Sequence, residues 1–171
     1  MEIFSTLDQL APLFEVGIEI GFFRYQSRAG YSFLAKSVPV YKIGITTDFW
    51  NHMGGVDILR EQKITLVHEL IHLYLQVIQQ EASLGKDAPG HCKWEAEIDA
   101  HATRIVDELP ELVRMVVAKI AAHPKCCVKF YSPYYDWLDN PTPFAEFYFV
   151  ELTNGLGCRL AAAQQLTLWD E

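Results

Sequence analysis

The sequence predicts an α+β protein, in which a small and mostly antiparallel sheet of about three strands packs on a central helix and on further helices. Residues 16–20, 31–34 and 38–47 alternate in polarity or are rich in β-branched and aromatic side chains, which favours strands. Residues 63–75 instead form an apolar run at helical spacing, and residues 111–122 repeat that spacing. The strands therefore precede a mainly helical second half, including a helical C-terminal part.

The chain has 171 residues, of which 50% are hydrophobic, and this is enough for one buried core. Residues 1–171 are therefore expected to form a single domain. The 14 basic and 22 acidic residues leave a net charge of −8, and the basic ones are scattered, which argues against nucleic acid or a membrane surface as partner. No signal sequence and no uncharged apolar run of about 18 residues occurs, so the expected location is cytoplasmic.

The four cysteines are Cys92, Cys126, Cys127 and Cys158. None of them forms a C-x-x-C pair, and adjacent cysteines rarely bridge each other. This spacing indicates reduced thiols rather than disulfides or a structural zinc site, as expected in a reducing compartment.

Short elements are expected on the N-terminal side of the central helix. Residues 5–11 should form a helix with Ser5 or Thr6 as its N-cap and Pro12 as its end. The third strand, residues 38–47, ends close to the central helix. Its edge is expected either to be covered or to be exposed and able to bind an extended peptide by strand addition.

The central helix carries His68-Glu69-Leu70-Ile71-His72 inside an apolar run, with Asp57 as its expected N-cap and an end near Ser83. Histidines four residues apart are offset by only about 40° around a helix, so both imidazoles can bind one metal ion. Glu69 lies about 100° from His68, beside the ion, where it can take a proton from a zinc-activated water.

The third ligand is expected on the next helix, which should begin near Lys93, because a catalytic zinc usually has three protein ligands. Glu95 and Asp99 share the face that should turn inward, and Asp99 could accept a hydrogen bond from a ligating histidine. Glu97 shares a face with other charged side chains, which is typical of a solvated surface. Glu95 is favoured, followed by His91 just before the helix, and then by Glu97 or Asp99.

His68-Glu69-x-x-His72 followed by Glu95-x-x-x-Asp99 resembles the gluzincin arrangement of zinc metallopeptidases. The flanking residues 63–67 and Ala102 resemble the small ImmA/IrrE-like group of zincins. The resemblance covers about residues 16–110. It implies a minimal zincin core, with His68, His72 and Glu95 as ligands of Zn²⁺, Glu69 as general base and Asp99 as the hydrogen-bond partner of a ligand.

A competing resemblance is to SprT-like proteases, which have a third histidine in an H-G/N-x-x-F/W context. Here Cys92 follows His91 in place of the glycine or asparagine, and Trp94 comes one residue early. The paired-cysteine ribbon of many SprT-like proteins is also missing, and the acidic charge suits DNA association poorly.

Aromatic residues gather in the segment 130–137, and helices are expected from Thr142 to Asn154 and over residues 158–166. A tyrosine of the aromatic segment, or His123, could stabilise an oxyanion, although packing is the usual role of such side chains.

The sequence therefore predicts a zinc-dependent peptidase acting on a protein or peptide substrate. A zinc-bearing regulatory or binding protein with little turnover is the alternative, and a DNA-associated SprT-like protease is the third hypothesis. The substrate's identity, the cleavage preference and the oligomeric state are left open.

Overall fold

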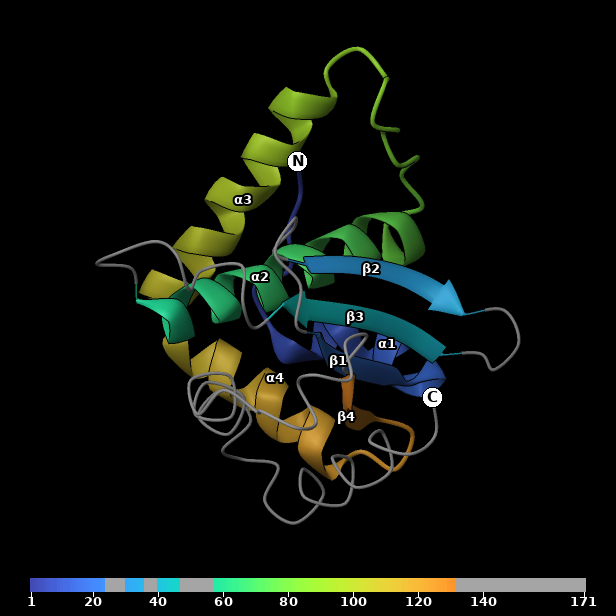
Figure 1. Ribbon diagram of the computed structural model, residues 1–171, viewed down its shortest axis with the longest axis vertical. Coiled ribbons are helices and arrows are strands. Elements are labelled where there is room, and N and C mark those ends of the chain that lie inside the picture. Colours follow the sequence, from blue (N-terminus) through green and yellow to red (C-terminus); the bar gives the residue numbers. More distant parts are fainter. Residues whose placement is uncertain (24–29, 36–39, 47–56, 132–171) are drawn as a thin grey trace.

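The computed structural model describes residues 1–23, 30–35, 40–46 and 57–131 (Figure 1). A four-stranded sheet lies against one helix that precedes its first strand and one helix that follows its third strand along the chain. The elements in chain order are a 3₁₀ turn η1 (Leu7–Leu10), α1 (Ala11–Val16), β1 (Ile18–Phe23), β2 (Gly30–Ala35), β3 (Val40–Thr46), α2 (Ile58–Leu73), a π-helical turn η2 (Tyr74–Ile78), α3 (His91–Glu108), α4 (Pro110–Ala122) and β4 (Cys127–Tyr131).

The sheet has the strand order β2-β3-β1-β4, in which β1 is parallel to both β3 and β4 and only β2 and β3 are antiparallel. The prediction of a mostly antiparallel sheet of about three strands is therefore wrong. Alternation along a strand shows which side chains share a face, but it does not specify the partner strand. The strand β4 was not predicted, and in its pairing with β1 Cys127 lies opposite Glu19. Such distant segments are not joined by a local turn whose sequence could have predicted the pairing.

Of the two alternatives for the edge of the third strand, the structure shows the covered one. β3 is that strand, and it is paired on one side with β2 and on the other with β1. β2 is the edge strand on this side of the described sheet, and α2 lies against both β2 and β3.

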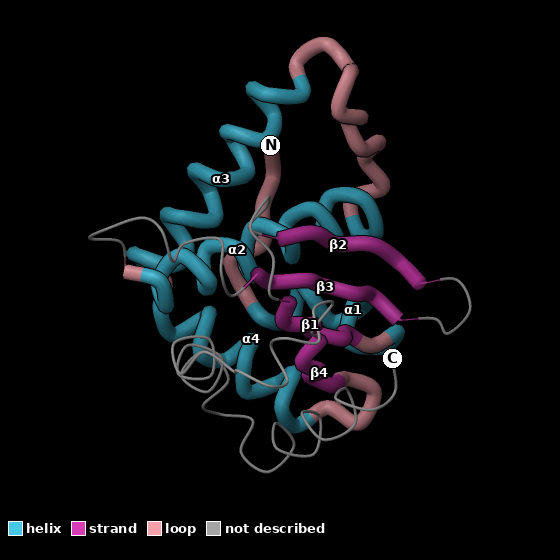
Figure 2. Tube along the Cα trace, in the orientation of Figure 1, coloured by secondary structure: helices cyan, strands magenta, loops and turns pink. Residues whose placement is uncertain are grey.

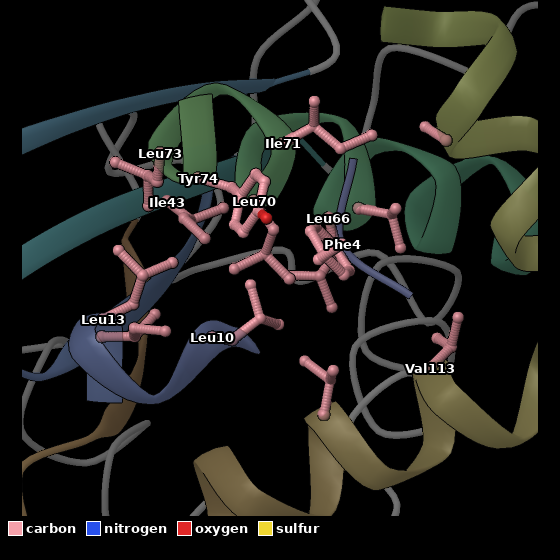
Figure 3. Packing of buried hydrophobic residues seen from close by; sticks show 14 of the residues in the cluster. Phe4, Leu10, Leu13, Ile43, Leu66, Leu70, Ile71, Leu73, Tyr74 and Val113 are labelled. Atoms are coloured by element: carbon pink, nitrogen blue, oxygen red, sulfur yellow. The ribbon is translucent and has the colours of Figure 1, made fainter. Parts of the chain in front are cut away.

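The core forms between α2, the sheet and the N-terminal helical segment (Figure 3). Leu66 and Leu70 of α2 are completely or almost completely buried, as are Leu10 and Leu13 on the segment that faces them. The apolar run of α2 is thus buried nearly all round, as expected for a helix that passes through a core. Asp57 is confirmed as its N-cap, because its side chain accepts a hydrogen bond from the backbone N–H of Arg60 at 3.1 Å.

Helix boundaries differ from the expected ones at three places. Pro12 does not end the first helix but lies in the first turn of α1, where its missing N–H costs no hydrogen bond. The central helix ends in the π-helical turn at Ile78 rather than near Ser83. α3 begins at His91, after Gly90 with a φ of 85°, rather than near Lys93.

Gly17 joins α1 to the central strand β1 in a conformation that excludes other residues. Its φ is +112°, and a Cβ built on it would lie 2.3 Å from the carbonyl oxygen of Lys125. Gly17→Ala is therefore expected to lower the free energy of unfolding by about 2–4 kcal/mol, through backbone strain and overpacking.

Chemical denaturation of both proteins measures this loss. Gly85→Ala is the matched control, because a Cβ there meets nothing within 4 Å and should leave stability almost unchanged. Equal stability of Gly17→Ala and the parent protein would contradict the close approach of Lys125.

The aromatic segment beyond Tyr131 and the helices expected over residues 142–154 and 158–166 lie outside the described residues. Among the described helices, none has the length and apolar character needed to span a membrane.

Candidate metal centre

Three side chains of types that can bind a metal ion converge between α2 and α3. His68 and His72 lie one turn apart on α2, and their Nε2 atoms are 3.1 Å apart. Glu95, in the second turn of α3, points its carboxylate at both rings, with Oε2 lying 3.0 Å from His68 Nε2 and Oε1 lying 3.1 Å from His72 Nε2. Within the described ranges this is the one group of three or more such residues whose ligand atoms lie close enough to share an ion.

The spacing of these atoms fits a small tetrahedral cation. Zinc bonds imidazole nitrogen and carboxylate oxygen at about 2.0–2.2 Å, so neighbouring ligand atoms of a tetrahedral site lie roughly 3.3 Å apart. The distances of 3.0–3.1 Å between the nitrogens and the carboxylate oxygens are close to this value. Two imidazoles and one carboxylate are also the donor set of many catalytic zinc sites, which keep their fourth position for water or substrate.

Asp99 lies one helical turn beyond Glu95 and approaches the other nitrogen of His68, with Oδ1 3.5 Å from Nδ1. A proton on Nδ1 directed at this carboxylate leaves the Nε2 lone pair of His68 free. That lone pair then faces the Glu95 carboxylate at 3.0 Å, where a cation between the two atoms would be stabilised. A proton on Nε2 would instead make the same contact a hydrogen bond, so the arrangement is compatible with a bound cation.

His72 is the less exposed of the two imidazoles, with 12% of its side chain accessible against 17% for His68. Burial lowers the pKa of His72 below its ordinary value, against the opposing effect of the Glu95 carboxylate, and the charge of His68 lowers it further. A neutral imidazole is the form that binds a metal ion.

The alternatives for the third ligand take other positions. His91 lies at the start of α3, and its Nδ1 is 2.9 Å from the carbonyl oxygen of Leu84, which can accept a hydrogen bond from it. Glu97 is exposed, on the side of α3 away from Glu95. Helical phase thus favoured the residue that the structure brings to the two histidines, although its role as a ligand stays a prediction.

Glu69, the expected general base, is buried on α2 with only 7% of its surface accessible. It does not belong to the group of three converging side chains. Its role as the general base stays a prediction.

Two contributors to the site have no clear signal in the sequence. The ring of Trp94 packs edge-on against that of His72, with centroids 4.9 Å apart. Arg60, near the start of α2, forms two hydrogen bonds of 2.9 and 2.7 Å with the carboxylate of Asp107 near the end of α3. This bidentate pair links the two helices that carry the converging side chains.

No protein-family model, curated protein or solved structure matches this chain.

Proposed function

We propose that this protein is a zinc-dependent peptidase that uses a gluzincin-like set of ligands, namely His68, His72 and Glu95. The observation that carries the proposal is the convergence of two Nε2 atoms and one carboxylate at mutual distances of 3.0–3.1 Å. A zinc ion held there would supply a water of lowered pKa and polarise the carbonyl group of a scissile peptide bond.

Two carboxylates of the protein are proposed to have the remaining roles in the reaction. Glu69 is proposed to accept the proton of the attacking water and to pass it to the leaving amine. Asp99 is proposed to orient His68 through Nδ1, at the 3.5 Å separation of the two atoms. The accessible fractions of Glu95 and Asp99, 32% and 64% of their side chains, support a site that an extended substrate can reach from the α3 side.

The proposal also keeps three predictions made from the sequence. The substrate is expected to be a protein or peptide, and nucleic acid is not expected as a partner, because the net charge is −8. A reducing, cytoplasmic setting is proposed as well, because the spacing of the four cysteines indicates reduced thiols.

Incubation of the purified chain with a proteome-derived peptide mixture tests the proposal. New peptide termini should form with zinc, stop forming after chelation and return when zinc is restored. Zinc binding without any cleavage would favour the regulatory or binding protein instead. A salt-sensitive shift of DNA in a gel would favour a DNA-associated protease.

The choice of Glu95 over Glu97 gives a prediction about metal affinity. Glu95→Ala should weaken zinc binding by about 100-fold or more, because it removes one of three protein ligands. Glu97→Ala is the matched control, since it removes an exposed carboxylate two residues away on the same helix. Competition with a chromophoric chelator measures both affinities, and equal losses in the two variants would contradict the assignment.

A further inference from the structure

We infer that Trp94 is a positioning residue, which holds the imidazole of His72 in the orientation that the metal centre requires. The inference rests on the proposed zinc site. It adds to that site a residue that is not itself a metal ligand. The ring planes of Trp94 and His72 meet at 71° with centroids 4.9 Å apart, which is the edge-to-face geometry that aromatic rings prefer.

The two histidines differ in what fixes their rings. His68 has the carboxylate of Asp99 3.5 Å from Nδ1, so a polar contact limits its rotation. For His72 the described residues provide no such contact at Nδ1, and its ring packs against the indole of Trp94 on the α3 side. Aromatic packing therefore takes the place that the contact with Asp99 takes at His68.

The ring of Trp94 also has a neighbour on α3, the ring of His91. The ring of His91 lies 6.2 Å from that of Trp94, within the range of aromatic contact. His91 Nδ1 in turn lies 2.9 Å from the carbonyl oxygen of Leu84, in the loop that leads into α3 (Figure 2). A continuous series of contacts thus joins the backbone at Leu84 to His72, through His91 and Trp94.

The location of Trp94 in the chain explains why its replacement should weaken metal binding. It directly precedes Glu95, and both side chains contact His72 from the same turn of α3. Loss of the indole would release the ring while the ligands themselves remained.

Zinc affinity of the full-length chain, measured by competition with a chromophoric chelator, tests the inference. Trp94→Ala should weaken binding about tenfold, the lower end of the effects seen when partners of metal ligands are removed. Trp94→Phe should stay within about threefold of the parent protein, because a phenyl ring can also pack against His72. Lys93→Ala is the matched control, an exposed neighbour that should have no effect.

Two further measurements distinguish a positioning role of Trp94 from a purely structural role. The visible absorption bands of the cobalt-substituted protein should change in Trp94→Ala and remain in Trp94→Phe, because they report ligand geometry rather than stability. His91→Ala should weaken binding about two- to threefold in the parent protein and not at all in the Trp94→Ala background, since His91 acts through the indole. If Trp94→Ala does not fold, Trp94→Leu replaces it under the same criteria.

The outcomes are distinct. A parent protein that binds neither zinc nor cobalt would overturn the proposed function and this inference with it. A parent protein that binds zinc, together with unchanged affinity and cobalt spectrum in Trp94→Ala or Trp94→Leu, would overturn the role of Trp94 alone.

Discussion

Glu69→Gln is expected to reduce peptide hydrolysis about 10²–10⁴-fold while leaving zinc binding unchanged. The amide has almost the same size as the carboxylate but cannot accept the proton of the attacking water. Glu69 lies outside the group of converging ligand atoms, so its replacement should remove the proton transfer without removing the metal. The ratio kcat/KM and the zinc content of the same preparation measure the two effects separately.

Glu61→Gln provides the matched control for this variant. Glu61 lies two helical turns earlier on α2, where its carboxylate pairs with Arg60 at 3.2 Å, away from the metal centre. The Glu61→Gln variant should retain full activity. Undiminished hydrolysis in Glu69→Gln would exclude Glu69 as the general base.

His68→Ala is expected to remove zinc binding and, with it, all activity. His68 is the side chain on which the site's contacts meet, since its two nitrogens face Glu95, His72 and Asp99. Without it only two protein ligands remain, too few for a stable zinc site. The apo-protein should still fold, because the core around α2 is formed by its apolar side chains.

Thermal unfolding with and without zinc gives a measurement that does not depend on a substrate. Zinc at 100 times its dissociation constant should add about 2.7 kcal/mol to the stability of the parent protein and nothing to that of His68→Ala. His101→Ala removes a histidine of α3 that belongs to no converging group among the described residues, and this variant should behave like the parent protein. Equal stabilisation of His68→Ala would contradict the proposed site.

The candidate site could be predicted from the sequence because helical periodicity relates residues within one segment. A spacing of four residues places His68 and His72 on one face, and the same spacing relates Glu95 to Asp99. Amphipathicity then separates the inward face of α3, which carries Ile98 and Ala102, from the exposed face that carries Glu97.

The sheet and the surroundings of the site could not be predicted in the same way. Strand order depends on contacts between distant segments, such as the parallel pairing of β1 with β4. The sequence of β4 did not show an alternation that would have predicted a strand. The contact of Trp94 with His72 and the link between Arg60 and Asp107 likewise depend on how α2 and α3 pack. Periodicity within each helix contains no information on such packing.

Anomalous diffraction from crystals grown with zinc, collected at the zinc edge, tests the central claim most directly. We expect one strong peak about 2.0–2.2 Å from His68 Nε2, His72 Nε2 and a carboxylate oxygen of Glu95. A zinc peak bound by other residues, or no peak between α2 and α3 in zinc-saturated crystals, would contradict it.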